Sequence, residues 1–326
     1  MSKSIPKKIL FTSTFKAPFV KSDELFLSKY FQVKSIQATG INFYLQLLKN
    51  IFLIDLSFSW FLSTYSATVI ILMRLLNKKS ILILGGVDVV SDKNLNYGIW
   101  NNPFKAFYLK FAIKYATHIL PVDESLKLEL LNKINYDLHN IQVVPTSVDF
   151  NYWTPKGAKQ NLILMVANIP DELRLKLKGA DFFYELAIAM PEYKFILIGV
   201  NKNLHNNFPR LKNFKILEFL NQSELLNYYR KAKIFCQLSL HEGLPNTLLE
   251  AMSCGAIPVG TKVGGITTLV KSNGYFIERN YLSETKSKFK KAILSSAKSL
   301  ENIRQHIISN YNPEKRESKI LNLINN

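Results

Sequence analysis

The sequence predicts an α/β protein built from two Rossmann-like halves. The chain of 326 residues is about the length of two typical domains, and its short apolar runs alternate with longer helical patterns. This alternation stops and restarts once, near residues 150–160, where Trp153-Thr154-Pro155-Lys156-Gly157 breaks the periodicity. We therefore expect an N-terminal domain over residues 1–152 and a C-terminal domain over residues 153–326.

In the first half, the apolar runs predict buried strands joined by helices. The strands are expected at Lys8–Thr12, Gln32–Ile36, Leu53–Phe58, Ser80–Leu84, His118–Val122 and Ile141–Val144, and the clearest helices at Thr64–Leu76 and Pro103–Tyr115. The span Ile51–Leu76 is apolar enough to raise the question of a transmembrane helix. Because Asp55 and several serines and threonines interrupt it, a buried strand followed by a buried helix is the better interpretation.

The second half repeats the pattern. Its strands are expected at Leu162–Val166, Lys194–Ile198, Lys215–Leu217, Ile234–Leu238 and Ile257–Gly260. Its helices are expected at Asp181–Met190, at Leu225–Lys231 behind an N-cap at Ser223, at Glu284–Ser296, at Leu300–Ile308 and after Pro313. The last helix is a candidate for packing back on the N-terminal domain.

Composition narrows the class of protein. Two cysteines, Cys236 and Cys254, provide neither a disulfide framework nor a metal-ligand cluster, and no secretory signal opens the chain, so a cytoplasmic protein is expected. The net charge of +18 fits an anionic membrane surface or an anionic substrate such as a nucleotide, but also a general richness in lysine. Because no arginine-rich element or zinc-finger spacing occurs, we do not expect nucleic-acid binding.

The most informative segment is residues 241–250, which read His-Glu-Gly-Leu-Pro-Asn-Thr-Leu-Leu-Glu. It places two carboxylates, Glu242 and Glu250, on either side of a loop-to-helix junction. Gly243 allows backbone angles barred to other residues, Pro245 suits a first helical turn, and Gly255 can end the helix. This arrangement can hold a polar ligand at a helix N-terminus, where free N–H groups favour anions, although surface charge alone is the simpler explanation of two glutamates.

Two further segments follow predicted strands. Lys176 and Lys178 precede Gly179 at the expected start of a helix, where they could hold a diphosphate or simply be solvated. Gly85-Gly86-Val87-Asp88 follows the strand at Ser80–Leu84, where glycines permit either close approach of a ligand or a tight turn.

The run from His241 to Val259, continued by Gly264-Gly265-Ile266, resembles the signature of group-1 (family 4 type) retaining glycosyltransferases of the GT-B fold. The resemblance implies two Rossmann-like domains that face a cleft. It implies that Glu242 lies at the donor sugar and that Glu250 binds the nucleotide ribose. The backbone of Gly243, Leu244, Pro245, Asn246 and Thr247 would line the sugar and the diphosphate.

The same resemblance gives Lys178 a contact to the donor phosphates. Where the family often has an arginine after the first strand of this domain, the chain has Asn168, so Arg174 and Lys176 are candidates for the second phosphate contact. Gly85, Gly86 and Asp88 would lie on the acceptor side of the cleft. The chain also departs from the family after its first strand, where Thr14-Phe15-Lys16-Ala17-Pro18 replaces a glycine-rich loop.

The function implied is transfer of a sugar from a nucleotide-diphosphate donor to a glycan or lipid-linked acceptor, with retention, in the synthesis of cell-surface polysaccharide or glycolipid. Lys178 would stabilise the departing diphosphate, and Glu242 would act as a nucleophile or, as we favour, position the sugar. We expect no cofactor beyond the donor, no bound metal, and a cytoplasmic protein that can lie on the anionic inner membrane surface. The missing arginine and glycine loop keep open the alternative of a non-catalytic sugar-nucleotide-binding scaffold.

Overall fold

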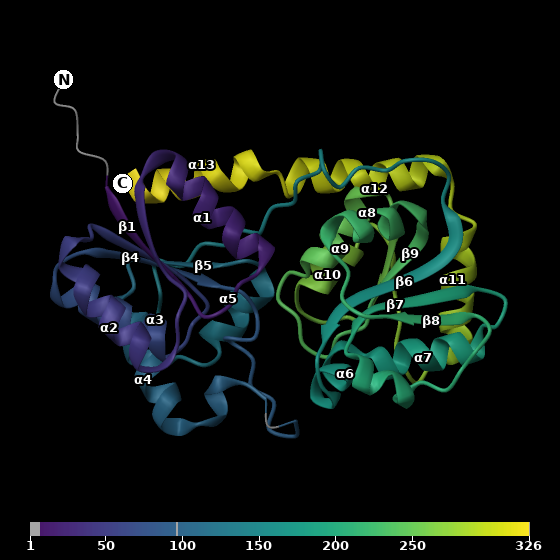
Figure 1. Cartoon of the computed structure of the whole chain (residues 1–326), viewed down its shortest axis with the longest axis horizontal. Helices are drawn as coiled ribbons and strands as arrows, with labels where there is room; N and C mark the ends of the chain where they lie inside the picture. The colour runs from purple at the N-terminus through teal and green to yellow at the C-terminus, as the bar shows by residue number, and fades with distance from the viewer. Residues whose placement is uncertain (1–6, 96, 326) are drawn as a thin grey trace. The chain divides into compact units, whose positions relative to one another are not determined.

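The computed structural model describes residues 7–95 and 97–325, which fold into two units (Figure 1). The first unit contains the chain up to Thr146 together with the residues from Arg316 onward, and the second contains Ser147–Lys315. The chain thus changes unit before the expected boundary at 152/153. The reason is that Val148 N–H donates to the carbonyl of Tyr311 (3.0 Å), which fixes this segment to the second unit.

The first unit is built around a parallel five-stranded sheet in the order β2-β1-β3-β4-β5. The strands are β1 (Lys8–Ser13), β2 (Gln32–Ile36), β3 (Leu56–Trp60), β4 (Lys79–Leu84) and β5 (His118–Pro121). The helices are α1 (Pro18–Tyr30), α2 (Gly40–Asn50), α3 (Thr64–Leu75), α4 (Pro103–Tyr115) and α5 (Glu124–Leu131), with 3₁₀ turns η1 (Ile51–Leu53) and η2 (Ile99–Asn101). Figure 1 shows α2, α3 and α4 on one side of this sheet and α1 on the other, beside α13 (Pro313–Asn325).

The apolar runs of the first half form its core as expected. β3 is buried along its whole length, and the following α3 buries Val69, Ile70 and Met73. The span Ile51–Leu76 is therefore a turn, a buried strand and a half-buried helix. Among the described residues, no helix combines the length and the hydropathy needed to cross a bilayer.

Two predicted strands of this half differ in the structure. The one expected at Leu53–Phe58 begins only at Leu56, because Ile51–Leu53 form a 3₁₀ turn. The one expected at Ile141–Val144 is wrong as a strand, since it joins β5 through an isolated bridge between Ile119 and Ile141.

The second unit is built around a parallel six-stranded sheet in the order β11-β10-β9-β6-β7-β8. The strands are β6 (Gln160–Ile169), β7 (Lys194–Val200), β8 (Phe214–Leu217), β9 (Ala232–Gln237), β10 (Ile257–Gly260) and β11 (Tyr275–Phe276). Numbered within the unit and read from β8, this is the order 3-2-1-4-5-6 of dinucleotide-binding folds. The helices are α6 (Glu172–Lys178), α7 (Ala180–Ala189), α8 (Gln222–Lys231), α9 (Asn246–Ser253), α10 (Gly264–Val270), α11 (Leu282–Ile293) and α12 (Ala297–Asn310), with a 3₁₀ helix η3 (Lys202–Asn207).

The N-cap of α8 corrects the expectation at Ser223. Asn221 caps this helix by accepting a hydrogen bond from the backbone of Glu224 (3.0 Å), and the Glu224 carboxylate accepts one from the backbone of Asn221 (2.9 Å). This reciprocal pair requires a spacing of three residues, which Asn221 and Glu224 have and Ser223 and Glu224 do not.

A buried ion pair joins the end of the chain to the first unit. Arg316 of α13 binds Asp23 of α1 through two contacts, Nη2 to Oδ2 (2.6 Å) and Nε to Oδ1 (2.8 Å), and the two side chains are 5% and 6% exposed. Trp60 Nε1 donates to the same carboxylate (3.0 Å), and the guanidinium lies 5.6 Å from the centre of the Trp60 ring. Arg316 also donates to the carbonyls of Val144 and Pro145. Every charge in this buried cluster is therefore paired.

Replacing Arg316 with alanine should destabilise the first unit by about 3–5 kcal/mol, because it leaves the Asp23 carboxylate buried without its cation. Chemical denaturation followed by tryptophan fluorescence would measure the change, with Trp100→Phe/Trp153→Phe as the background so that the signal reports on Trp60. A matched control is Lys21→Ala, which removes an exposed ion pair with Glu24 (2.9 Å) from the same helix and should cost less than about 1 kcal/mol. Equal effects of the two substitutions would contradict the anchoring role of Arg316.

Candidate functional site

The site lies where the strand order of the second sheet reverses. β6 and β9 are neighbours in the sheet, but the chain leaves them in opposite directions, toward β7 and toward β10. Ligands of open α/β sheets bind outside the carboxyl ends of the strands at such a point. Here the carboxyl end of β6 leads to α6, and that of β9 leads to the loop that carries Glu242.

A close backbone contact holds these two segments together. Leu240 N–H, in the loop after β9, donates to the carbonyl of Leu177 in α6 (2.8 Å). Gly179, which ends α6, has a φ of +73°, and a Cβ atom added there would lie 2.2 Å from the carbonyl oxygen of Leu238. Only glycine suits this position, because both its backbone angle and its contact exclude a side chain.

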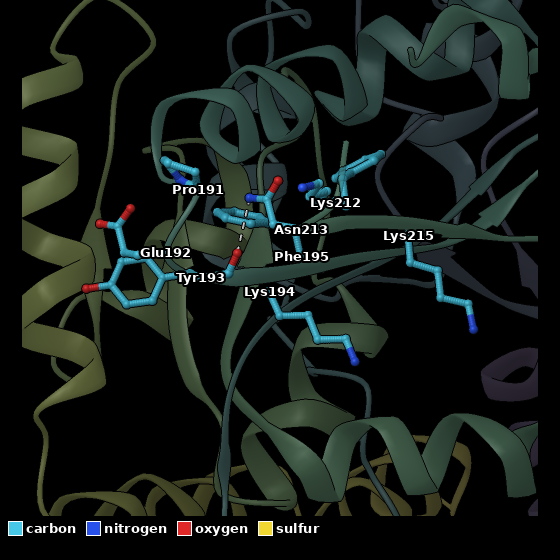
Figure 2. Close-up of a pocket in the computed structure, with 9 residues that line it drawn as sticks. Pro191, Glu192, Tyr193, Lys194, Phe195, Lys212, Asn213 and Lys215 are labelled. Atoms are coloured by element: carbon cyan, nitrogen blue, oxygen red, sulfur yellow. Dashed lines mark hydrogen bonds between the residues drawn. The ribbon is translucent and has the colours of Figure 1, made fainter. Parts of the chain in front are cut away.

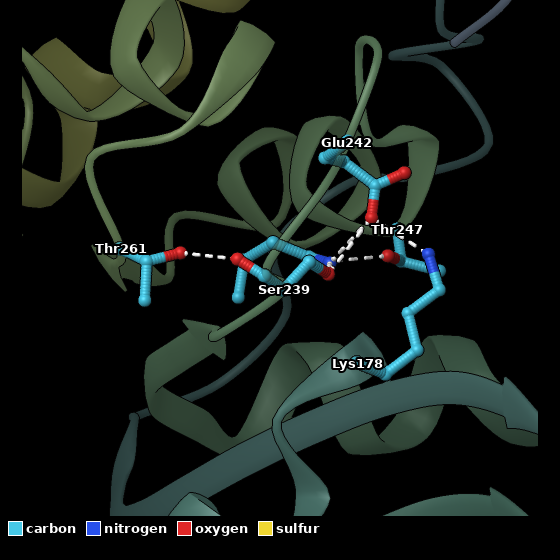
Figure 3. Close-up of polar contacts among 6 residues, drawn as sticks. Lys178, Ser239, Glu242, Thr247 and Thr261 are labelled. Atoms are coloured by element: carbon cyan, nitrogen blue, oxygen red, sulfur yellow. Dashed lines mark hydrogen bonds and ion pairs between the residues drawn. The ribbon is translucent and has the colours of Figure 1, made fainter. Parts of the chain in front are cut away.

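This contact brings Lys178 to Glu242, as Figure 3 shows. Lys178 Nζ lies 2.7 Å from Glu242 Oε2, and the two side chains are 20% and 16% exposed. The same oxygen accepts hydrogen bonds from Ser239 Oγ (2.9 Å) and Gln237 Nε2 (3.2 Å). One carboxylate oxygen thus receives three donors from two segments, which fixes the orientation of Glu242.

Neighbouring hydroxyl groups extend the network. Gln237 Nε2 also donates to Ser239 Oγ (3.0 Å), and Gln237 Oε1 accepts from Thr247 Oγ1 in the first turn of α9 (3.3 Å). Thr261 Oγ1 donates to the carbonyl of Ser239 (2.7 Å). The network therefore joins the ends of β9 and β10 to the start of α9.

Gly264 and Gly265 support the loop from the other side. A Cβ atom on Gly264 would lie 1.9 Å from the Glu242 carbonyl oxygen, and one on Gly265 would lie 2.3 Å from that of Gly243. Gly265 N–H donates to the carbonyl of Gly243 (2.8 Å). Gly243 itself is not among the described residues with positive φ, so the unusual backbone angle expected there occurs instead at Gly264, with a φ of +48°.

The three cations near Gly179 do not all lie on the same side of their helix. Arg174, Lys176 and Lys178 lie within α6, not in a loop before a helix, and α7 begins only after Gly179. Arg174 and Lys178 are four residues apart and share one side of α6, whereas Lys176 is exposed on the other side. Arg174 is therefore the better placed of the two candidates for a second phosphate contact.

Glu250 occupies a different environment within α9. Its Oε2 accepts a hydrogen bond from the hydroxyl of Tyr229 in α8 (3.0 Å). Burial raises the pKa of Glu250 to about 7, although the hydrogen bond from Tyr229 opposes the increase. Burial, together with the neighbouring carboxylate, also raises the pKa of Tyr229 well above its ordinary value. Lys159 Nζ donates to the backbone carbonyl of Tyr229 (2.9 Å), and burial lowers the pKa of Lys159 to about 8.

The start of α9 is arranged to receive a polar group. Pro245 is the N-cap of this helix, one residue before the first turn in which the sequence placed it, and no side chain caps the helix by a hydrogen bond. Leu244 and Pro245 are buried, whereas Asn246 and Thr247 are partly exposed. The first amide groups of a helix without a side-chain cap can donate to an anionic ligand.

The residues expected on the acceptor side belong to the first unit. The buried carboxylate of Asp88 accepts hydrogen bonds from the backbone N–H groups of Leu62 (2.9 Å), Gly85 (3.1 Å) and Gly86 (2.7 Å). Burial raises the pKa of Asp88, and these backbone bonds oppose the increase. A Cβ atom on Gly85 would lie 2.2 Å from the Phe61 ring, and Phe61 itself has a φ of +66°. Asp88 therefore joins the ends of β3 and β4 in a tight turn.

A hollow of about 440 Å³ lies at the opposite, amino edge of the second sheet (Figure 2). Asn213, which directly precedes β8, donates hydrogen bonds to the carbonyls of Ala187, Met190 and Tyr193 in the segment before β7. These bonds give Asn213 a structural role away from the Glu242 network. Within residues 7–95 and 97–325, no group of three or more histidine, cysteine, aspartate or glutamate side chains is arranged to hold a metal ion.

Sequence reasoning missed Gln237, Ser239 and Tyr229. A signal existed for the first two, because Gln237 and Ser239 are polar residues within and directly after the predicted strand Ile234–Leu238, where a buried strand ends at the site. Tyr229 had no comparable signal, since its contact with Glu250 depends on how α8 packs beside α9.

Comparisons with known proteins relate the second unit to a family of enzymes. Residues 154–311, which make up most of the second unit, match the family model "Glycosyl transferases group 1". The chain is similar to the UDP-Gal:alpha-D-GlcNAc-diphosphoundecaprenol alpha-1,3-galactosyltransferase of Escherichia coli, with 24% identity over 65% of this chain and 61% of that protein. It is also 24% identical to the glycogen synthase of Chlamydia pneumoniae, over 63% of this chain and 55% of that protein. The chain thus spans less than two thirds of the length of these relatives.

Solved structures show the fold. The sucrose-phosphate synthase of Thermosynechococcus elongatus superposes with a TM-score of 0.79 at 12% identity, covering 98% of each chain. The Anabaena protein HepE, solved in complex with UDP-glucose, superposes with a TM-score of 0.75 at 14% identity, covering 98% of this chain and 99% of that one. The expected fold class is confirmed: both units are parallel-sheet α/β domains of the GT-B type.

Replacing Glu250 with glutamine should change how stability depends on pH. Because the pKa of Glu250 rises from 4.5 to about 7 on folding, its stabilising contribution is complete below pH 4.5 and is lost as the pH rises through 7. Between pH 4.5 and 8 the wild type should therefore lose about 3 kcal/mol of unfolding free energy relative to Glu250→Gln. Urea denaturation at several pH values would measure the difference.

Tyr229→Phe provides the matched variant for this experiment. It removes the hydrogen bond that lowers the pKa of Glu250, so the loss of stability should extend to higher pH than in the wild type. Parallel pH profiles for the wild type and Glu250→Gln would contradict the assignment.

Proposed function

We propose that the chain transfers a sugar from a nucleotide-diphosphate donor to a glycan or lipid-linked acceptor, with retention of configuration. The observation that carries this proposal is the Lys178–Glu242 pair (2.7 Å) at the point where the strand order of a group-1 glycosyltransferase domain reverses. The names of the relatives support a sugar nucleotide as donor, and HepE was solved with UDP-glucose.

Lys178 is proposed to stabilise the leaving diphosphate. Its ammonium group has three N–H donors, and one of them is used by Glu242. The remaining donors can reach phosphate oxygens, and Arg174 on the same side of α6 adds a second cation. Charge that develops on the leaving group would thus be stabilised electrostatically by residues already in place, and the proposal includes no metal ion or further cofactor.

Glu242 is proposed to position the donor sugar. Three donors converge on its Oε2, namely Lys178, Ser239 and Gln237, which hold the carboxylate in one orientation and make that oxygen a weaker nucleophile. The backbone from Gly243 to Thr247 would line the sugar and the diphosphate, with the first amide groups of α9 as donors.

Glu250 is proposed to bind the ribose of the nucleotide. Tyr229 holds one of its oxygens, which orients the carboxylate toward ligand hydroxyl groups. In the first unit, the turn of Gly85, Gly86 and Asp88 is proposed to contribute to acceptor binding, with the Asp88 carboxylate fixing the turn through backbone bonds.

The acceptor and the location of the protein are proposed from the relatives and the charge. The name of the E. coli relative specifies a diphosphoundecaprenol-linked sugar, and the name of a human relative specifies phosphatidylinositol N-acetylglucosaminyltransferase. A net charge of +18 suits a protein that works at an anionic lipid surface. We propose a cytoplasmic, peripheral enzyme in cell-surface polysaccharide or glycolipid synthesis.

Lys178→Ala and Glu242→Ala should each reduce sugar transfer by at least about 10²–10³-fold, because each removes a charge that the reaction uses. Screening purified protein against mixed sugar nucleotides by mass spectrometry would identify the donor, and the variants would then be assayed with it. Circular dichroism would verify that they fold. The matched control is Lys176→Ala, which removes an exposed cation from the other side of α6 and should change the rate by only a few-fold. Wild-type activity in Lys178→Ala or Glu242→Ala would overturn the assignment.

The alternative function is a sugar-nucleotide-binding scaffold without turnover, which Asn168 favours because it stands where the family often has an arginine. Calorimetric titration with UDP-, GDP- and ADP-sugars, combined with product analysis, would separate the two functions. Binding without transfer or hydrolysis would support the scaffold.

A further inference from the structure

We infer that the outer faces of α2 and α4 form a docking surface for an anionic phospholipid bilayer. The inference rests on the proposed function in one respect: the docking surface would bring the enzyme to a lipid-linked acceptor. The surface itself is argued from the exposure, spacing and charge of side chains within the first unit.

α2 carries two apolar stripes instead of one. Phe43 and Leu47 face the core and are buried. Ile41, Leu45 and Leu48 are 78%, 53% and 58% exposed, and their spacing of four and three residues places them on one outer face of the helix. Phe52 and Leu53, directly after the helix, are 70% and 65% exposed and extend this face. A helix that only covered a sheet would carry polar residues there.

α4 repeats the arrangement with aromatic residues. Phe104, Phe107 and Phe111 are 86%, 74% and 45% exposed and lie on one outer face, while Leu109 and Ile113 face the core. Large phenylalanine side chains in water are costly, since burying one contributes about 1.5–3 kcal/mol.

The two outer faces belong to one layer of helices. α3 lies between α2 and α4, because the ring of its Tyr65 packs against Phe43 of α2 (4.9 Å between centres) and its Thr68 hydroxyl bonds Tyr108 of α4 (3.0 Å). Figure 1 shows the three helices on the same side of the first sheet. Both apolar faces therefore point away from that sheet on the same side of the unit.

The charged residues of these helices indicate what binds to this surface. The sequences of α2, α3 and α4 contain no aspartate or glutamate, and their basic residues are Lys49, Arg74, Lys105, Lys110 and Lys114. Apolar residues interleaved with cations match an interface of acyl chains and anionic headgroups, to which lysine side chains extend. A second copy of the chain fits less well, because a two-fold interface through this surface would bring like charges together.

Vesicle co-sedimentation tests the inference. The full chain should bind vesicles of phosphatidylcholine mixed with phosphatidylglycerol and bind vesicles of phosphatidylcholine alone at least tenfold more weakly. Lys105→Gln/Lys110→Gln/Lys114→Gln should weaken binding to the mixed vesicles by roughly 100-fold, from about fivefold per lysine near an anionic surface. Phe104→Ser/Phe107→Ser and Leu45→Ser/Leu48→Ser should each weaken it at least about tenfold.

Matched controls come from exposed residues of the second unit. Lys286→Gln/Lys290→Gln removes exposed cations from α11, and Ile188→Ser/Leu294→Ser removes exposed apolar side chains, so both should bind vesicles as the wild type does. Equal binding to neutral and mixed vesicles, or wild-type binding by the α2 and α4 variants, would overturn the inference. A change of oligomeric state in these variants without lipid would overturn it as well, in favour of a second copy as the occupant.

Failure of this inference and failure of the proposed function are distinguishable. The α2 and α4 variants should bind sugar nucleotide in calorimetry as the wild type does, because their substitutions lie in the first unit and Lys178 and Glu242 in the second. Lys178→Ala should conversely bind vesicles as the wild type does. Loss of vesicle binding in Lys178→Ala would contradict the docking surface, whereas loss of transfer alone would leave it intact.

Discussion

The candidate site depends on one close approach between two backbone segments. Lys178 directly precedes Gly179, and Glu242 follows Leu240 by two residues, so the contact of Gly179 and Leu177 with Leu238 and Leu240 sets the separation of the two charges. A lysine side chain alone could adopt many rotamers. Because the backbone beneath it is fixed, only the rotamers of the Lys178 and Glu242 side chains remain to be restricted when the pair forms. The proposed chemistry thus depends on Gly179, a residue that takes no part in it.

The two glutamates of the signature face contrasting environments. Glu242 receives a cation and two neutral donors, whereas Glu250 accepts a hydrogen bond from the Tyr229 phenol, and burial raises its pKa to about 7. The ionised form of a buried carboxylate such as Glu250 is stabilised most by hydroxyl donors that a ligand supplies, since hydrogen bonds to the ionised form oppose the effect of burial. This contrast is consistent with a charged reaction centre at Glu242 and a neutral, hydroxyl-bearing ligand group at Glu250.

The sequence predicted the fold better than the network within the site. The strand β2 and the helix α4 were predicted at their observed bounds, because a short extended segment between helical patterns and a proline at a helix start are local signals. The edge segment at Ile141 was not, because whether an apolar run pairs as a strand depends on a neighbour distant in sequence. The same limit applies to the site. Glu242, Glu250 and Lys178 stand in a recognisable motif, whereas Tyr229 reaches Glu250 only through helix packing.

The return of the chain at Arg316 has a consequence for how the protein is made. The first unit needs Arg316 to neutralise Asp23, yet the two residues are separated by the whole of the second unit. During synthesis the whole second unit leaves the ribosome before the first unit can form its ion pair with Arg316. This reverses the usual order, in which the N-terminal domain completes its folding first. Until then the Asp23 carboxylate of the nascent first unit lacks its cation, so this unit reaches its final stability only after α13 has left the ribosome.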